Sequence, residues 1–456
     1  MWECTDEEEW KNLLLPFRKS QAKGNIIIVT TRFSALAGKV KTTNRTIELE
    51  GIEGAEFEEL FLSFVFGDDQ SARKDHALLE TGLKIMDKLK GSPLAAKTVG
   101  RLLRDHLDLN HWDTILKTTE WESTDNDNNN NIMPALKLSY DYMPFHLQPC
   151  FLYCTLFPED YRFKKEELIY FWIGQDILQS HCQNKSIEDI GLRNLDDLIS
   201  HGFFKKEEEN GHNCYIIHDL LHDLALKVAS NECLVISHTD VRSLEIRPSV
   251  RHLCIDLEHA NGDSDGANSD NFINELMKIL DTKLKIEHLR TLMVFGEMNE
   301  NFATGLGNLI RKASGLRVLH LSDMCSLMGF ITLPHLRYLS LGKSGYSEIH
   351  IPIILSRFYH LRILDLQKWC GSLDLPRDMS NLTKLGHFLT KDDEDHSKIY
   401  NAGKLQFLQE LKRFRVNKES NGFEPKQLGE LINIREHGIY NVEKIHSEEE
   451  AIEANI

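Results

Sequence analysis

The spacing of apolar residues changes along the chain and divides its first part into two segments. Ile26–Val29 is a β-branched run after Gly24-Asn25, which predicts a strand buried on both faces, as in a parallel sheet. From Glu56 to Thr119 apolar residues recur every three or four positions, as in amphipathic helices. Gly91-Ser92-Pro93 ends one of these helices and allows the next to begin. The pattern predicts an α/β piece over 1–45 and a helical domain over 46–125.

A polar, low-complexity segment, Asp125–Asn131, marks the next boundary. Residues 126–240 have a mostly helical pattern, and 202–217 predict a small hairpin, an order that is typical of a winged-helix domain. Some helix-turn-helix folds bind DNA, but residues 131–240 contain 9 basic and 17 acidic side chains, a balance that repels phosphate backbones. We therefore expect a winged helix that packs against protein and no nucleic-acid partner.

Beyond residue 240 one pattern, Leu-x-x-Leu-x-Leu, recurs. It begins at Leu289, Leu316, Leu336 and Leu361, with a weaker match at Val250 and degraded matches at Leu385 and Leu411. The successive starts lie 39, 27, 20, 25, 24 and 26 residues apart, near the period of about 20–29 residues that leucine-rich repeats show. Residues 241–456 are therefore predicted to form a leucine-rich-repeat solenoid, which we expect to be incomplete at its end.

In such a repeat the leucines point into a stacked core, and the residues between them line the concave face of the strands. That face is where a protein partner would be expected to bind. The candidate partner-binding residues are Arg317, His320, Arg337, Tyr338, Arg362 and Asp365.

Composition narrows the class of protein further. The net charge of −17 opposes broad binding to nucleic acids. No apolar run approaches the roughly 18 residues that span a bilayer, and the acidic N-terminus does not have the order of a secretory signal. Nine cysteines without paired spacing fit a reducing compartment. We expect a cytoplasmic protein without a membrane span.

Four short motifs carry a more specific resemblance. They are IIIVTTR at 26–32, GSPLA at 91–95, CFLYCTLFPEDY at 150–161 and Ile217-His218-Asp219. In this order, and followed by the repeats, they resemble the landmarks of plant NB-ARC leucine-rich-repeat disease resistance proteins of the coiled-coil, non-TIR lineage. The resemblance covers nearly the whole chain and implies a multidomain fold: an α/β remnant, helical and winged-helix domains, and a leucine-rich-repeat solenoid.

The resemblance also implies a role in plant defence, in which an ADP/ATP-binding switch is joined to protein recognition by the repeats. By this resemblance Arg32 would sense the terminal phosphate, Pro93 would pack beside adenine, and His218 would reach the β-phosphate. The implied partners are a pathogen effector or a guarded host protein, and a full-length receptor with which the chain could associate in trans.

The phosphate-binding elements of that family have no counterpart in these residues. The sequence contains no G-x-x-x-x-G-K-[ST] loop and no apolar strand ending in paired aspartates, and Met1-Trp2 resembles the residues that follow that strand. We therefore expect an N-terminally truncated chain that is not an enzyme and has lost nucleotide binding. Two other hypotheses are a leucine-rich-repeat binding scaffold without nucleotide switching, and a working ATPase whose loop lies upstream in the real transcript.

His218 and His222 lie one helical turn apart in His-Asp-Leu-Leu-His, which resembles the zinc-protease pattern H-E-x-x-H. Asp219 is one methylene shorter than the glutamate base, and no third ligand follows at a typical spacing. Hydrogen bonding at a helix surface or domain boundary is the simpler interpretation, and we expect no metal.

Overall fold

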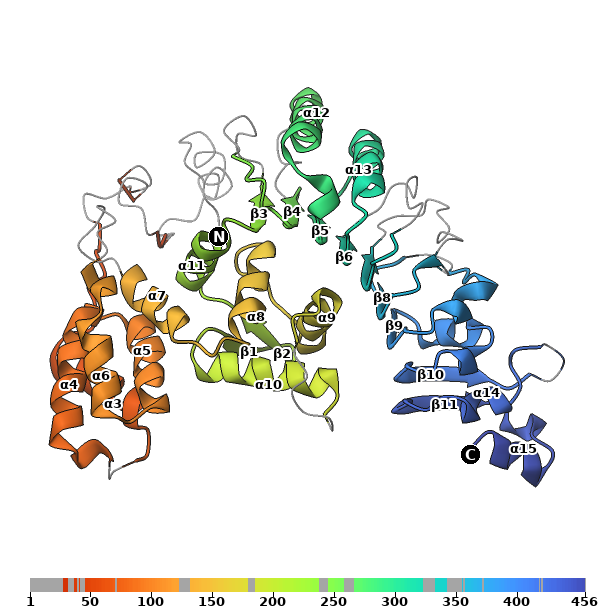
Figure 1. Ribbon diagram of the computed structural model, residues 1–456, viewed down its shortest axis with the longest axis horizontal. Helices are drawn as coiled ribbons and strands as arrows, with labels where there is room; N and C mark the ends of the chain where they lie inside the picture. The colour runs from red at the N-terminus through yellow and green to blue at the C-terminus, as the bar shows by residue number, and fades with distance from the viewer. Residues whose placement is uncertain are drawn as a thin grey trace, which may run out of the picture. The chain divides into compact units, whose positions relative to one another are not determined.

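The computed structural model of the chain divides into two compact units, Met1–Ser139 and Tyr140–Ile456 (Figure 1). Each unit is described by itself. The structure describes residues 28–31, 37–38, 41, 46–69, 72–122, 132–178, 185–237, 245–257, 266–322, 333–342, 355, 357–370, 373–417, 419 and 421–455.

The first unit contains helices where the three- and four-residue spacing predicts them. Its buried core includes Phe61, Val65 and Leu103, together with Trp112, whose indole N–H donates to the carbonyls of Leu103 (3.1 Å) and His106 (2.8 Å). The four main helices are α3 (Gly54–Phe66), α4 (His76–Met86), α5 (Pro93–Asp105) and α6 (Leu109–Lys117).

The start of α5 shows how the GSPLA motif acts locally. Gly91 has a φ of 69°, a left-handed conformation that favours glycine, and its carbonyl accepts a hydrogen bond from the Ile52 N–H at 2.9 Å. The Ser92 hydroxyl caps the helix by accepting from the Ala95 N–H, and Pro93 occupies the first turn. The motif thus ends one helix and begins the next, as its sequence predicts.

The predicted strand at Ile26–Val29 is not found in its described part. Ile28 and Val29 are in no strand, and Ile28 is 86% exposed. The physical reason is that a strand needs hydrogen-bonding partners, and the described residues provide none at this segment. The predicted linker Asp125–Asn131 lies outside the described residues.

The second unit begins with a helical domain that carries a hairpin. In the hairpin, β1 and β2 pair antiparallel, and the turn between them is Asn210-Gly211, both with positive φ, as a tight two-residue hairpin turn requires. The predicted hairpin is therefore present. The elements are α7 (Met133–Asp141, at the unit boundary), α8 (Gln148–Tyr153), α9 (Lys165–Gln175), α10 (Ile187–Ser200), β1 (Lys205–Glu209), β2 (His212–Ile216) and α11 (Asp219–Ala229).

A parallel sheet follows, and its strands pair in chain order from β3 to β9 (Figure 1). The leucines of each Leu-x-x-Leu-x-Leu match are buried on the inner side of these strands, as predicted. The strands are β3 (Cys233–Ile236), β4 (His252–Asp256), β5 (Thr291–Phe295), β6 (Val318–Leu321), β7 (Tyr338–Leu341), β8 (Ile363–Leu366) and β9 (His387–Thr390). Because β3 pairs with β4, this sheet begins before the predicted boundary at residue 240.

The last repeats form a second, two-stranded parallel sheet of β10 (Glu410–Arg415) and β11 (Glu436–Tyr440). Here the predicted register needs a correction. The Gln409 N–H donates to the Gly386 carbonyl (2.9 Å), as the residue after the first leucine does in earlier repeats, so the repeat begins at Leu408 rather than at Leu411. The remaining helices are α12 (Gly266–Lys283), α13 (Glu300–Lys312), α14 (Lys426–Gly429) and α15 (Glu448–Glu453).

Candidate functional site

Helix α9 lies directly against the parallel sheet. The helix is buried on all sides from Leu168 to Gln175, which agrees with its apolar sequence. The ring centroids of Phe171 and Tyr338 are 4.5 Å apart. At Gly174 an added Cβ would lie 2.7 Å from the Tyr338 Cβ, so only glycine permits this close approach. The winged helix and the repeats are therefore packed together within the second unit.

A buried polar cluster joins the same two parts. The Thr291 hydroxyl contacts Tyr153 Oη (3.2 Å) and His252 Nδ1 (2.9 Å), and it accepts from the Gln175 side-chain amide. The same amide donates to the Arg290 carbonyl at 3.1 Å. Desolvation of the ring and the charge of Arg290 lower the pKa of His252 to about 3, so this histidine is neutral near pH 7. Each of these buried polar atoms at the interface therefore has a hydrogen-bond partner.

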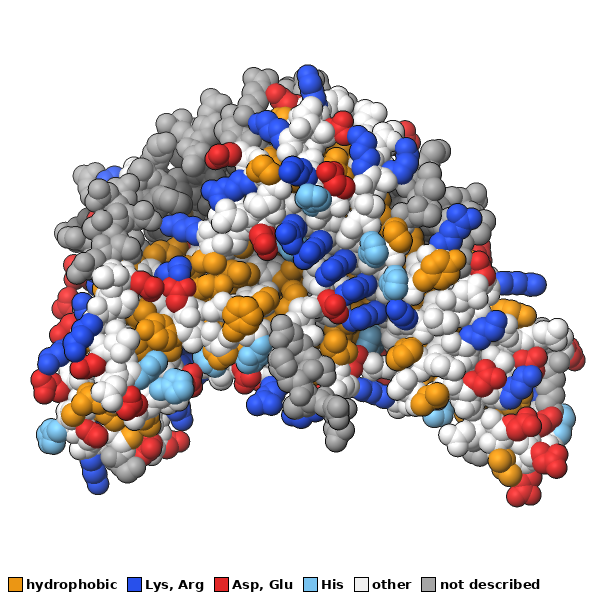
Figure 2. Space-filling view, in the orientation of Figure 1, with side chains coloured by type: hydrophobic (Ala, Val, Ile, Leu, Met, Phe, Trp, Pro, Cys, Tyr) orange, Lys and Arg blue, Asp and Glu red, His pale blue; other side chains and the backbone are white. Residues whose placement is uncertain are grey.

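An arginine follows the first apolar position of five repeats and forms a ladder across the sheet. Backbone hydrogen bonds connect the rungs, because each arginine N–H donates to the carbonyl of the preceding arginine at 2.7–2.8 Å. In Figure 2, Lys and Arg side chains gather in a row over the strands of this region. The arginine ladder consists of Arg251, Arg290, Arg317, Arg337 and Arg362.

One carboxylate pairs with the arginine ladder among the described residues. Asp176 ends α9 in a left-handed conformation and lies 2.8 Å from Arg337 and 3.2 Å from Arg362. Partial burial would raise the pKa of Asp176, but hydrogen bonding and charge from these arginines hold it below its ordinary value. Arg317 donates to the Gln175 carbonyl at 3.3 Å. Within the described part of the chain, no acidic side chain pairs with Arg251 or Arg290.

Glu188, near the start of α10, makes a second connection to the repeats. It accepts hydrogen bonds from Gln409 (2.6 Å) and lies 3.2 Å from His387 Nε2 and 3.6 Å from Arg435. Burial would raise the pKa of Glu188, but the hydrogen bonds from His387 and Gln409 outweigh it and hold the pKa at about 2. Tyr170 packs on His387 with ring centroids 4.5 Å apart. Glu188 therefore stays ionised and holds α10 beside the later repeats.

The structure places the six predicted partner-binding residues beside this interface. His320 is 2% exposed and Tyr338 is 1% exposed, and both pack on Phe171 of α9. Asp365 accepts from the Tyr338 hydroxyl at 3.2 Å, and burial raises the pKa of Asp365. Their role in binding a partner stays a prediction, but a partner would reach His320 and Tyr338 only by displacing α9. The three arginines of the predicted set are half-buried: Arg317, Arg337 and Arg362.

The predicted nucleotide-binding residues are not brought together by anything the structure describes. Arg32 lies outside the described residues. Pro93 is exposed at the first turn of α5 in the first unit. His218, in the second unit, is the exposed N-cap of α11, where its Nδ1 accepts from the Leu220 N–H at 3.3 Å and contacts Asp219. Their proposed roles remain predictions from the resemblance.

His222 has a structural role that fits the simpler of its two interpretations. Its Nε2 donates to the Phe157 carbonyl at 3.1 Å, because a carbonyl can only accept, and burial lowers the pKa of the ring. His222 thus connects α11 to the CFLYCTLFPEDY motif. Over the residues with described positions, no group of three or more His, Cys, Asp or Glu side chains is arranged to hold a metal ion.

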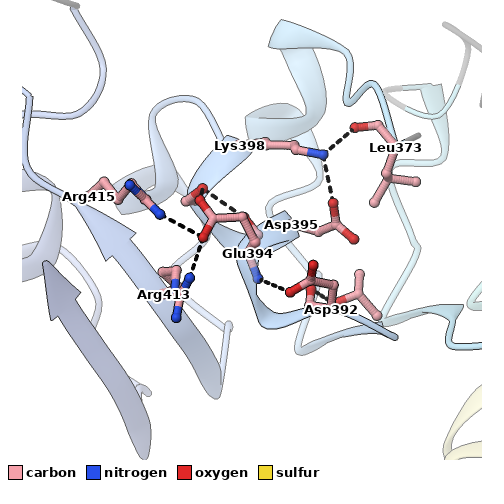
Figure 3. A network of polar contacts seen from close by, with 9 residues as sticks. Leu373, Asp392, Glu394, Asp395, Lys398, Arg413 and Arg415 are labelled. Carbon is pink, nitrogen blue, oxygen red and sulfur yellow. Dashed lines mark hydrogen bonds and ion pairs between the residues drawn. The ribbon is translucent and has the colours of Figure 1, made fainter. Parts of the chain in front are cut away.

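In the later repeats two arginines pair with a carboxylate of the chain. Glu394 accepts from Arg415 at 2.7 Å and also from Arg413, and these bonds lower the pKa of Glu394 to about 2 (Figure 3). The Ser397 hydroxyl donates to the same carboxylate at 2.9 Å. Arg413 also lies over the ring of Tyr440, 4.5 Å from its centroid. These cations are compensated within the chain.

Sequence reasoning identified three members of the arginine ladder and missed Arg251 and Arg290. The signal for them was present, because an apolar residue followed by arginine recurs at Val250, Leu289, Leu316, Leu336 and Leu361. In the two following repeats the same position holds Gly386 and Gln409, where the ladder stops.

The comparisons with known proteins agree with this architecture. The family described as disease resistance protein winged helix domain matches residues 156–225, and a leucine-rich repeat region matches residues 288–455. The chain thus carries a disease-resistance winged helix followed by leucine-rich repeats. Both matches fall within the second unit.

Its relatives are named plant disease resistance proteins, which confirms the predicted resemblance. The chain is 34% identical over 226 residues to the putative disease resistance protein RGA1 of Solanum bulbocastanum, covering 49% of this chain and 22% of that protein. It is 27% identical over 365 residues to the putative disease resistance RPP13-like protein 1 of Arabidopsis thaliana, covering 78% and 32% respectively. The probable disease resistance protein RF45 of the same plant is 25% identical over 441 residues, covering 92% and 41%. The chain spans less than half the length of each of these three relatives.

Across the portion of the chain with described positions, every helix falls short of the length and apolar character that a bilayer span requires.

Proposed function

We propose that this chain is a receptor-like protein of plant defence that recognises other proteins through its repeats and catalyses no reaction. The winged-helix and repeat matches, together with relatives named as disease resistance proteins, support this proposal. A pathogen effector or a guarded host protein is the partner class, and the cytoplasm is the compartment that the cysteine usage favours.

The arginine ladder favours one chemistry for such a partner, an acidic protein segment. Neighbouring parallel strands lie about 4.8 Å apart, so the rungs repeat at a spacing that successive carboxylates can match. Guanidinium groups bind carboxylates through two parallel hydrogen bonds. Arg251 and Arg290 have no acidic partner among the described residues, although the chain as a whole has a net charge of −17. These two arginines, which meet no carboxylate among the described residues, are the observation that carries the proposal.

Binding of a fluorescent oligo-aspartate peptide, followed by anisotropy, tests the ladder. The double variant Arg251→Gln/Arg290→Gln should weaken binding about tenfold, because two charge-assisted contacts are lost. The matched control is Arg413→Gln/Arg415→Gln, whose arginines already pair with Glu394, and it should change binding less than about twofold. Raising salt from about 50 to about 300 mM should weaken wild-type binding strongly. Equal losses in the two double variants would contradict the proposal.

For nucleotides we propose that these residues alone retain neither ADP nor ATP firmly. The sequence has no phosphate-cradling loop, and each missing charge-assisted contact removes about 1.5–3 kcal/mol of binding free energy. Arg32, Pro93 and His218 would then be remnants of a site rather than a site. A filter-binding assay with labelled ADP and ATP tests this, and firm retention of either nucleotide would refute it.

A leucine-rich-repeat scaffold without nucleotide switching is the second candidate, favoured by the close packing of α9 on the sheet. Peptide binding measured with and without ADP or ATP separates the two candidates. An affinity that no nucleotide changes supports the scaffold, whereas an affinity that shifts with nucleotide supports a switch. Finding the G-x-x-x-x-G-K-[ST] loop upstream in the transcript would also restore the switch.

A further inference from the structure

A second row of side chains runs beside the arginine ladder. It comes from the residue just before the first leucine in three successive repeats, and all three side chains are exposed. Figure 2 shows histidines next to the row of basic side chains. Gly315 holds the equivalent position in the preceding repeat and separates His288 from this row. We name it the histidine row: His335, His360 and Lys384.

The members of the histidine row contact one another. The rings of His335 and His360 are stacked, with centroids 6.4 Å apart and planes 18° apart. Lys384 Nζ lies 3.0 Å from His360 Nδ1. An ammonium group can only donate a hydrogen bond, so His360 Nδ1 must be the acceptor and the ring must be neutral in this arrangement.

The groups that face His360 are cations. Burial, followed by the charges of Lys384, His335, Arg337 and Arg362, lowers the pKa of His360. The carboxylate of Asp176 pairs with the two arginines. Protonation of His360 would break the hydrogen bond from Lys384 and add one positive charge beside the arginine ladder. A bound anion is what would make that protonation favourable.

We propose that the histidine row is a proton-dependent extension of the acidic-partner surface, on which partner carboxylates bind with uptake of a proton by His360. The inference rests on the proposed function of the arginine ladder. Binding draws Lys384 away from His360, and the carboxylates then contact the ammonium and the protonated His360 ring. The partner is the same acidic segment, and its affinity rises as pH falls.

The test measures the affinity of the full chain for the labelled oligo-aspartate peptide between about pH 8 and pH 6, where the peptide stays ionised. Wild-type affinity should rise about fivefold over this range, because His360 becomes charged beside the peptide. The variant His335→Gln/His360→Gln should keep the affinity seen at pH 8 and lose the rise. The matched control His437→Gln, an exposed histidine on β11, should keep the rise. Circular dichroism at each pH separates these changes from loss of fold.

A second variant tests the role of Lys384. Removing its charge in Lys384→Gln should let His360 protonate more easily, so the midpoint of the affinity change should move to higher pH. Titration calorimetry in two buffers of different ionisation enthalpy should show proton uptake by the wild type and none by the double histidine variant. A side chain that acts only in folding would not move either quantity.

The outcomes separate the two proposals. If the wild type binds no peptide at any pH, the proposed function of the arginine ladder fails and this inference fails with it. If the wild type binds tightly but with the same affinity at every pH, only the histidine row is refuted. A rise that persists in the double histidine variant would also overturn it.

Discussion

Two sets of arginines on the same succession of repeats have different surroundings. In the later repeats Arg413 and Arg415 share the carboxylate of Glu394 (Figure 3). This carboxylate also accepts from the Ser397 hydroxyl. In the earlier repeats Arg251 and Arg290 meet no carboxylate among the described residues. The same side chain is therefore neutralised in one region and left available in the other.

This difference shows that residue type alone does not identify a binding surface. A guanidinium that already holds a carboxylate gains little from a second one, whereas an unpaired one offers its full hydrogen-bonding fork. The last two arginines of the ladder, Arg337 and Arg362, are an intermediate case, because they share the single carboxylate of Asp176. Three substitutions, each with a matched control, test these differences in surroundings.

The largest effect is expected from separating α9 from the sheet. In Gly174→Leu the new Cβ would lie 2.7 Å from the Tyr338 Cβ and 3.0 Å from Val318 Cγ2. Such overpacking should lower the free energy of unfolding of the second unit by about 2–3 kcal/mol. Hydrogen exchange should show α9 and β7 opening earlier, and urea unfolding gives the energy.

The control for this change is Gly386→Ala, whose new Cβ would meet its nearest atoms, the carbonyl oxygens of Arg362 and Phe407, at 3.6 Å. That is an ordinary contact, so stability should stay within about 0.5 kcal/mol of the wild type. If the two glycine variants are equally stable, the close packing of α9 against Tyr338 does not hold these parts together.

A smaller effect should follow from Asp176→Asn, which removes the carboxylate from the last two arginines of the ladder. Arg337 and Arg362 would become as available as Arg251, and oligo-aspartate should bind about threefold more tightly. Anisotropy measures the gain. Asp196→Asn, an exposed position on α10, removes the same charge elsewhere and should leave the affinity unchanged. An equal gain in both variants would show that net charge, rather than the ladder, governs binding.

The smallest effect is expected in the later repeats. Glu394→Gln should free Arg413 and Arg415 and raise peptide affinity by about twofold, since these arginines are surface groups screened by solvent. The exposed Glu443→Gln serves as the control for the loss of one negative charge. Should Glu394→Gln leave affinity at the control value, the contrast between the two arginine sets would not rest on Glu394.

The parts of the fold that depend on local spacing could be predicted from the sequence. The hairpin was predicted within 202–217 and is present there, and the parallel strands follow from the recurring Leu-x-x-Leu-x-Leu pattern. The register of the seventh repeat was wrong by three residues because Leu408 and Leu411 both fit a degraded pattern, and only the backbone bond of Gln409 distinguishes them. Strand β11 was missed because Arg435 to His437 interrupt its apolar positions.

The burial of His320 and Tyr338 under α9 could not be predicted from local spacing. Phe171 and Tyr338 are far apart in the sequence, and nothing in either repeat or helix indicates that the two rings meet. His320 and Tyr338 therefore appeared to be free for a partner, whereas they are buried under α9. The arginines that recur at one position of five repeats indicate the candidate binding surface better than His320 and Tyr338 do.

The backbone bonds that join successive arginines have a further consequence for how such a protein can vary. The repeat starts that carry these arginines are separated by 39, 27, 20 and 25 residues, yet each arginine N–H reaches the previous arginine carbonyl at nearly the same distance. Segments inserted or deleted between strands thus leave the pitch of the guanidinium groups unchanged. The length of the outer loops can therefore vary while the spacing of the arginines that face a partner stays the same.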